Sequence, residues 1–347
     1  MIVELIKDYA LFLAKTMTIA LAIFLVLRGV ATIWRHQRKI SPRKMKVKKL
    51  NRHYEHLRDA IKDEMLSEYE WKKAAKERRK RRKAEKKKAK SGPQPEKKKV
   101  FVLSFKGDIL ASAVSSLREE VTAVLTVAKP SDEVVVRLES AGGTVNSYGL
   151  AASQLLRLKR KNISLTVLVD KVAASGGYLM ACVADRILAA PFAVVGSIGV
   201  VSEVPNFNRL LKKHDIDYEL ITAGEYKRTL TMFGENTEKG RKKFIEQLED
   251  VHAIFKEFLK ENRAQVDTAA VATGEHWHGR RAIELKLVDE LITSDDYLFA
   301  ASETSDIYEV EYKIPETFRE RLISGLTQSL SQALHSLWSR IEKHGFV

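Results

Sequence analysis

From residue 100 onward, short runs of apolar and β-branched residues alternate with longer stretches of helical periodicity. This alternation restricts the possible fold classes more than any other feature of the sequence, because buried strands separated by crossover helices form a parallel sheet. We therefore predict an α/β fold. The predicted strands are VFVLSF (100–105), EVVVRLE (133–139), ISLTVLVD (163–170), RILAA (186–190) and YELITAG (218–224), and the predicted helices span 112–128, 146–160, 175–184 and 238–264.

Two glycine-containing segments follow predicted strands, where open α/β sheets gather ligand and catalytic groups. SAGGTV (140–145) follows Glu139, and its adjacent glycines allow close backbone approach and exposed amides. KVAASGGY follows Asp170 and places Ser175 at the start of a helical pattern, where amide donors would stabilise an oxyanion. Taken singly, each glycine pair is more often a plain turn.

A nucleophilic serine also needs a group that takes its proton. The chain has no G-x-S-x-G elbow and no order of His and Asp typical of a Ser-His-Asp triad. A lysine can replace the histidine when burial keeps its amine neutral near pH 7. AGEYKRTL (223–230) supplies Lys227 directly after a predicted strand, although its spacing alone favours an ordinary surface lysine.

The segment YALFLAKTMTIALAIFLVLRG (9–29) is long and apolar enough to span a membrane. Glu4 and Asp8 before it, and the absence of a small-residue cleavage site after it, favour an uncleaved anchor over a signal peptide. Basic residues crowd the side after the span, so the positive-inside rule predicts a cytoplasmic catalytic domain, with a periplasmic one as the alternative. ILAAPFAVVGSIGVVS (187–202) is shorter and contains Pro and Gly, so we predict core strands and turns there.

The net charge of +15 comes from one segment, because residues 28–99 hold 28 Lys or Arg against 9 Asp or Glu. KERRKRRKAEKKKAK (76–90) has no interleaved aromatic residues to stack on bases, so we expect a charged helix near anionic lipid rather than a nucleic-acid site. SGPQPEKKK (91–99) is typical of a linker. The single cysteine, Cys182, and the histidine spacing indicate no metal, and we expect no cofactor.

Five motifs, taken in order, resemble the signal peptide peptidase A family of membrane-bound serine proteases and are closest to its SohB branch. They are SAGGTV (140–145), AASGGY (173–178), APFAVVGSIGV (190–200), GEYKR (224–228) and GEHWHGRRAIELKLVDEL (274–291). The resemblance covers roughly residues 99–295. It implies a ClpP/crotonase-like fold with an N-terminal transmembrane helix, an ATP-independent Ser-Lys peptidase that cleaves unstructured or hydrophobic peptides, and the bacterial inner membrane.

Carried over by position, the resemblance makes Ser175 the nucleophile and Lys227 the general base. Gly143 and Gly176 match the oxyanion-hole amides, and Ser197 matches a serine that orients the lysine amine. Two positions depart from the family pattern: Ala141 stands where a proline is usual, and Lys286 replaces the glycine of G-L-V-D, which predicts a different shape for that loop.

The same resemblance implies a homo-oligomeric ring or dome, in some relatives with serine and lysine from adjacent subunits. We predict four regions: an anchor (1–29), a basic helical segment with linker (30–99), the peptidase domain (100–295) and a C-terminal amphipathic helical extension (296–347). The apolar stripe of LISGLTQSLSQALHSLWSRI (322–341) fits core packing, an oligomer contact or a membrane surface. The alternatives to a peptidase are a non-catalytic membrane scaffold of the same fold and a crotonase-like acyl-CoA enzyme.

Overall fold

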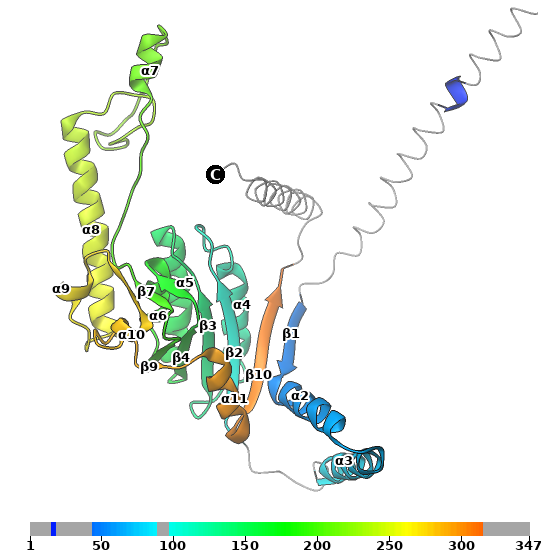
Figure 1. Cartoon of the computed structure of the whole chain (residues 1–347). Coiled ribbons are helices and arrows are strands. Elements are labelled where there is room, and N and C mark those ends of the chain that lie inside the picture. The colour runs from blue at the N-terminus through cyan, green and yellow to red at the C-terminus, as the bar shows by residue number, and fades with distance from the viewer. Residues whose placement is uncertain (1–14, 19–43, 89–96, 315–347) are drawn as a thin grey trace, which may run out of the picture. The chain divides into compact units, whose positions relative to one another are not determined.

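The computed structural model describes residues 15–18, 44–88 and 97–314 (Figure 1). Nearly all of them belong to one compact unit, Met45–Tyr312. No helix within these ranges combines the length and the apolar content that crossing a bilayer requires. The predicted span, 9–29, lies outside the described residues apart from 15–18, and the predicted C-terminal helix, 322–341, lies wholly outside them.

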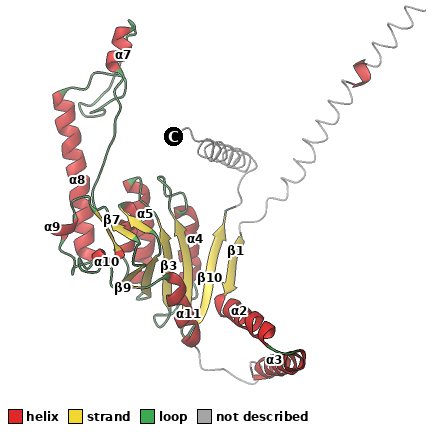
Figure 2. Cartoon of the chain, in the orientation of Figure 1, coloured by secondary structure: helices red, strands yellow, loops and turns green. Residues whose placement is uncertain are grey.

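A seven-stranded sheet forms the centre of this unit, in the order β1-β10-β2-β3-β4-β6-β9 (Figure 2). Every pair from β10 to β9 is parallel, as the alternation of strands and helices predicts. The strands are β1 (Lys44–Lys49), β2 (Lys99–Lys106), β3 (Glu133–Glu139), β4 (Ser164–Val169), β6 (Arg186–Ala189), β9 (Glu290–Leu291) and β10 (Asp306–Lys313).

The helices of the crossovers cover one face of the sheet with a large apolar core. Because side chains alternate along a strand, Leu103 of β2 and Val136 of β3 point into this core, and both are fully buried. The helices that meet there are α4 (Val114–Leu125), α5 (Val145–Lys159), α6 (Gly176–Ala181) and the C-terminal part of α8 (Glu238–Asn262).

The opposite face carries a smaller core under α2 (Leu50–Met65) and α11 (Ser294–Thr304). Val102 and Val135 point toward it, and Tyr54 of α2 packs edge-on against Phe299 of α11. α3 (Glu68–Lys88) follows α2 after two residues. The described part of the basic segment is therefore largely helical, and it also contributes the edge strand β1.

A small second sheet stands at the carboxyl edge of the first, with the order β5-β7-β8. β5 (Val172–Ala174) and β7 (Val194–Gly196) are parallel, and β8 (His276–His278) runs antiparallel to β7. The apolar run at 187–202 therefore forms strands and turns, as predicted. The short helices α9 (Thr268–Val271) and α10 (Gly279–Ala282) flank β8 in the sequence.

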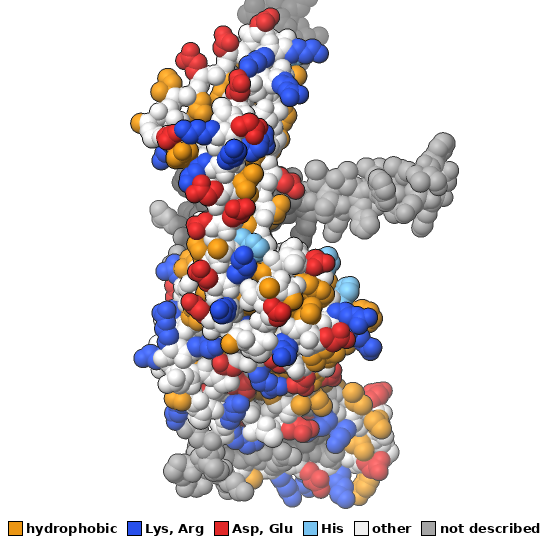
Figure 3. Space-filling view, turned by 90° about the vertical axis from the view of Figure 1, so that its left-hand side faces the viewer, with side chains coloured by type: hydrophobic (Ala, Val, Ile, Leu, Met, Phe, Trp, Pro, Cys, Tyr) orange, Lys and Arg blue, Asp and Glu red, His pale blue; other side chains and the backbone are white. Residues whose placement is uncertain are grey.

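Residues 205–237 and the N-terminal half of α8 form a segment with few buried side chains, which we call the arm. α7 (Asn208–Lys213) lies within it, and Phe207, Tyr218 and Phe233 form an aromatic cluster. Figure 3 shows apolar side chains scattered among charged ones on this side of the molecule. Phe255 and Leu259, near the other end of α8, are buried in the large core.

The prediction of a strand at 218–224 is wrong, because these residues form a loop of the arm. Their apolar side chains have no sheet to enter, and Ile221 is 90% exposed. Strands β1 and β10 were not predicted and lie outside the range 100–295 proposed for the peptidase domain, so the sheet uses residues on both sides of that range. The other predicted strands and helices are present within a few residues of their predicted bounds.

Candidate active site

Ser175 occupies the turn between β5 and α6 in a strained conformation, with φ 51° and ψ −120°. Non-glycine residues rarely adopt positive φ, and such strain gathers at functional sites. The turn is fixed on both sides: the Ser175 N–H donates to the Gly196 carbonyl at 2.8 Å, and the Ser175 carbonyl accepts the Leu179 N–H at 2.9 Å. A sharp strand-to-helix turn of this kind presents a serine hydroxyl outward from the sheet.

The glycine loop after β3 packs directly against this turn. Ser140 pairs with β5, donating to the Val172 carbonyl at 2.9 Å and accepting the Ala174 N–H at 3.0 Å. Gly142 comes next with φ 94°, and a Cβ there would lie 2.8 Å from the Ser175 Cβ. Only glycine combines that φ with so close an approach. The two segments singled out in the sequence therefore meet in space.

The predicted oxyanion amides belong to these same two segments. None of the hydrogen bonds within the described residues uses the N–H of Gly143 or of Gly176. Gly143 lies against the Ile109 backbone, and Gly176 lies against the Tyr148 ring. Two amide donors without acceptors, on the two segments that enclose a serine, are what an oxyanion would need.

Ser197 lies beside Ser175, because β5 and β7 run in parallel register with Ala174 opposite Gly196. Its φ is also left-handed, at 53°, and its N–H donates to the Glu275 carbonyl at 2.6 Å. The ring of Trp277 covers Gly196 so closely that a Cβ there would meet ring carbon Cε3 at 2.7 Å. The structure thus brings Ser175, Gly176, Ser197 and the glycine loop together.

Lys227 is not part of this cluster within one chain. It is an exposed residue of the arm, and no hydrogen bond or ion pair joins it to Ser175 in the part of the chain that the structure describes. Its neighbours attach to the first turns of α8: Glu225 pairs with Lys239, and the Lys243 amine lies over the Tyr226 ring. Lys239 lies in the first turn of α8, and Phe255 lies where α8 enters the large core. The two are sixteen residues apart, which corresponds to about 24 Å along a helix.

Two residues that the sequence analysis did not single out, Tyr148 and Asp108, support the glycine loop through Ser140. The hydroxyls of Ser140 and Tyr148 share a hydrogen bond of 2.5 Å, and the Tyr148 hydroxyl also donates to the Asp108 carbonyl at 2.8 Å. Burial raises the pKa of Tyr148, so its phenol stays protonated and remains a donor. The available signal was Tyr148 itself, an aromatic residue three positions after the end of SAGGTV.

An ion pair made by a buried arginine holds the C-terminal end of α8 near α6. Arg263 is 1% exposed, and its guanidinium donates to both carboxylate oxygens of Asp289, at 2.9 and 3.1 Å, and to the Lys286 carbonyl at 2.8 Å. Tyr178, in the first turn of α6, donates to the Leu287 carbonyl at 2.8 Å. Lys286 adopts φ 60°, the left-handed conformation that glycine takes more readily. One loop thus fastens both helices.

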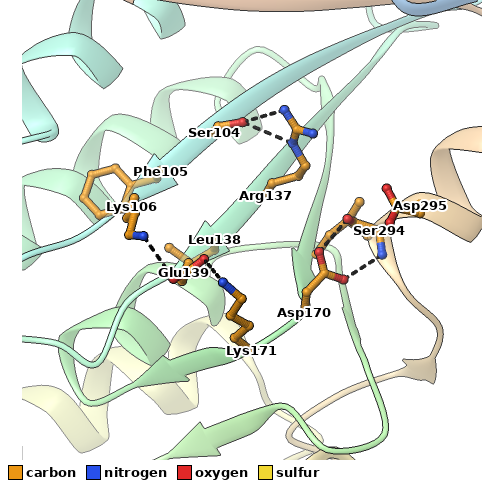
Figure 4. A pocket seen from close by; sticks show the side chains of 11 residues that line it. Ser104, Phe105, Lys106, Arg137, Leu138, Glu139, Asp170, Lys171, Ser294 and Asp295 are labelled. Atoms are coloured by element: carbon orange, nitrogen blue, oxygen red, sulfur yellow. Dashed lines mark hydrogen bonds and ion pairs between the residues drawn. The ribbon is translucent and has the colours of Figure 1, made fainter. Parts of the chain in front are cut away.

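A cavity of about 330 Å³ lies elsewhere, at the carboxyl ends of β2, β3 and β4 (Figure 4). Lys106 and Lys171 both pair with Glu139, and Asp170 accepts from Ser294. None of the predicted site residues lines this cavity. Cys182 is not a competing nucleophile, because it is fully buried and burial raises its pKa to about 12.

Two family models match the chain. The family model described as Peptidase family S49 N-terminal matches residues 4–155, and the model Peptidase family S49 matches residues 157–307. This chain belongs to peptidase family S49. The S49 assignment confirms the family resemblance carried by the five motifs, and it confirms a protease as the class of protein.

Individual relatives agree with the S49 assignment. A "Probable protease SohB" of Haemophilus influenzae is 47% identical, covering 96% of this chain and 97% of that relative. A "Probable protease SohB" of Buchnera aphidicola subsp. Acyrthosiphon pisum is 56% identical over 69% of this chain and 71% of its own length. The match to the solved structure of a membrane-bound stomatin-specific protease mutant with a substrate peptide covers 67% of this chain and 99% of that chain, at 14% identity and a TM-score of 0.41.

Proposed function

We propose that this S49 chain is a serine endopeptidase with Ser175 as its nucleophile and Lys227 as its general base. The observation that carries the proposal is the strained turn at Ser175, enclosed by two segments whose glycine amides lack acceptors in the described residues. Such strain costs folding free energy and persists only where the surrounding contacts impose it. The parallel sheet with its small second sheet supports a ClpP/crotonase-like fold.

In the proposed mechanism, Lys227 removes the Ser175 hydroxyl proton and the serine oxygen attacks a peptide carbonyl. The amides of Gly143 and Gly176 stabilise the resulting oxyanion. The C–N bond then breaks, the lysine returns its proton to the leaving amine, and water releases the acyl-enzyme. Ser197 orients the lysine amine. The general base acts as the neutral amine.

We propose further that Lys227 acts on Ser175 of a second copy of the chain. Within one copy, Lys227 is exposed on the arm, and its neighbours lie along the N-terminal turns of α8. The arm also exposes apolar side chains that an assembly would bury, among them Ile221, Leu220 and Phe233. A homo-oligomeric ring or dome would satisfy both features.

The remaining parts of the proposal concern location and substrate. A helix at 9–29 would anchor the chain in a bacterial inner membrane, with the catalytic domain in the cytoplasm by the charge rule and in the periplasm as the alternative. Buried apolar residues around the turn, such as Leu179 and Ile198, favour unstructured hydrophobic peptides as substrates.

Mass spectrometry of peptide digests tests the chemistry. The wild type should cleave an unstructured apolar peptide without ATP, and Ser175→Ala and Lys227→Ala should each lose at least about 1,000-fold in rate. Lys161→Ala, which changes an exposed lysine elsewhere, serves as the matched control and should retain full activity. Full cleavage by Ser175→Ala would refute the assignment, and an inactive wild type would favour the non-catalytic scaffold.

A mixing experiment tests whether the dyad forms between copies. Ser175→Ala and Lys227→Ala proteins are mixed, dissociated and reassembled, so that mixed oligomers hold intact serine and lysine on different chains. Restored cleavage in the mixture supports the dyad between copies. If only the wild type cleaves, the lysine must reach the serine of its own chain.

A further inference from the structure

The first turn of α2 is fixed firmly to the body of the protein. The Asn51 side chain donates to the carbonyls of Ser302 and Ser305 at 3.0 and 2.8 Å and accepts the Ile307 N–H at 2.8 Å. Leu50 is buried beside it in the smaller core. This attachment sets the direction in which the rest of α2 leaves the sheet.

Beyond that attachment, α2 carries an apolar stripe that is largely exposed. Leu57, Ile61 and Met65 recur every fourth residue, so they share one face of the helix, and they are 51%, 65% and 78% exposed. Asp59 and Asp63 lie on the opposite face by the same periodicity. The exposed fraction of these three side chains increases from Leu57 to Met65, whereas the apolar face of a helix that packs on its own fold is buried.

The turn into α3 is followed at once by two exposed aromatic residues. Ser67 and Glu70 form a capping box: the Ser67 N–H donates to the Glu70 carboxylate at 3.1 Å, and the Glu70 N–H donates to the Ser67 hydroxyl at 3.4 Å. Tyr69 and Trp71, in the first turn of α3, are both exposed. Tyr and Trp are the residues that gather at the headgroup level of bilayers.

α3 then supplies a strong positive charge. Its sequence, EYEWKKAAKERRKRRKAEKKK, contains twelve Lys or Arg against four Glu. Lys73, Lys76 and Lys80 are exposed. Each basic residue near an anionic bilayer contributes about 1 kcal/mol of attraction.

We propose that the outer half of α2 and the helix α3 form a docking surface for an anionic lipid bilayer, which we call the lipid face. The apolar stripe enters the headgroup region, Tyr69 and Trp71 lie at its boundary, and exposed lysines of α3 such as Lys73, Lys76 and Lys80 contact lipid phosphates. The positive charge of α3 is complementary to an anionic bilayer, so the lipid face should bind an anionic bilayer. An acidic nucleic acid would leave the stripe of Leu57, Ile61 and Met65 without an apolar partner.

Spin labelling of the full chain in nanodiscs tests the lipid face. A nitroxide is attached at Met65→Cys and, as a control, at Val127→Cys, since the native Cys182 is buried and does not react. Replacing part of a phosphatidylcholine disc with phosphatidylglycerol should lower the accessibility of the label at 65 to an aqueous nickel complex about threefold, and leave that at 127 unchanged. Equal accessibility at 65 in both discs overturns the proposal.

Charge reversal identifies the residues responsible. Lys72, Lys73, Lys76 and Lys80 are changed to Glu together, and the effect of phosphatidylglycerol at position 65 should disappear. Reversing Arg118, Lys161, Lys213 and Lys242, all exposed outside α3, should leave it intact. Circular dichroism verifies that both variants keep their helices. Protection of position 65 by RNA but not by anionic lipid would overturn the proposal in favour of nucleic acid.

The lipid face rests on the proposed membrane anchoring of the chain, and the experiment distinguishes the failure of one proposal from the failure of the other. A chain without a spanning segment would not enter phosphatidylcholine nanodiscs at all. In that event, phosphatidylglycerol vesicles added to the same labelled protein still report on position 65, and the absence of protection there overturns the lipid face alone.

Discussion

At the scale of single residues, Gly142 decides how closely the loop after β3 approaches Ser175. Its φ of 94° and the absence of a side chain allow its backbone to lie against the Ser175 Cβ and the Gly176 amide nitrogen. Any side chain at this position would move one of the two segments. The spacing between the serine and the oxyanion amides therefore depends on this glycine.

We expect Gly142→Ala to lower the peptidase rate about 100-fold, because a displacement of about 1 Å between reacting groups has that effect. The free energy of unfolding should fall by about 1–3 kcal/mol from backbone strain. Gly274→Ala is the matched control, since Gly274 has φ 85° and a Cβ added there would meet no atom within 4 Å. Peptide digestion and urea unfolding separate the two effects, and equal activity of the two variants would contradict the role of Gly142.

At the scale of elements, sequence reasoning succeeds where burial is unambiguous. β2, β3, β4 and β6 are mostly apolar and mostly buried, so their pattern alone predicts strands in a parallel sheet. β1 and β10, in contrast, read KMKVKK and DIYEVEYK, and such charged sequences form strands only because a neighbouring strand is available. The loop at 218–224 has the apolar pattern but no neighbour, which periodicity cannot reveal.

The end of β10 is held by a buried carboxyl group. Glu120 of α4 is only 4% exposed, accepts the Tyr312 N–H at 2.8 Å, and has a second oxygen without a partner among the described atoms. Burial raises the pKa of Glu120 to about 7, the Tyr312 N–H opposes the shift, and Glu311 adds to it. The folded state therefore holds a proton that the unfolded state releases at lower pH.

This proton makes stability depend on pH. The contribution of Glu120 is fully present below the ordinary glutamate pKa and is lost as pH rises through about 7. Glu120→Gln should match the wild type at low pH and exceed its free energy of unfolding by about 2–3 kcal/mol at alkaline pH. Urea unfolding across this pH range measures the difference, and parallel pH curves for the two proteins would disprove the effect.

At the scale of the whole molecule, the candidate site is only partly encoded in neighbouring sequence. The motifs predict which residues carry the chemistry, and parallel register explains why Ser175 and Ser197 meet. No pattern in the sequence reveals that Lys227 is carried on an arm whose contacts run along α8. The contacts of that arm depend on tertiary structure and, in our proposal, on a second copy.

Assembly should therefore be sensitive to charge on the arm. Ile221→Glu places a carboxylate where a side chain is 90% exposed in one copy, so the stability of the isolated chain should not change. Native mass spectrometry should show loss of oligomers, and peptide cleavage should fall with it. Val127→Glu, at an exposed apolar residue outside the arm, should assemble normally, and intact oligomers of Ile221→Glu would exclude this surface as the contact.

The positive φ angles at Ser175 and Ser197 reduce the stability of the fold, while the hydroxyls at the same two positions serve the proposed reaction. Glycine would relax either position, so Ser175→Gly should raise the melting temperature, with a gain of about 1 kcal/mol in the free energy of unfolding. A search for heat-resistant variants would select these two codons early. Each such substitution would remove a hydroxyl that the proposed reaction uses. Selection for thermal stability alone would therefore lower peptidase activity.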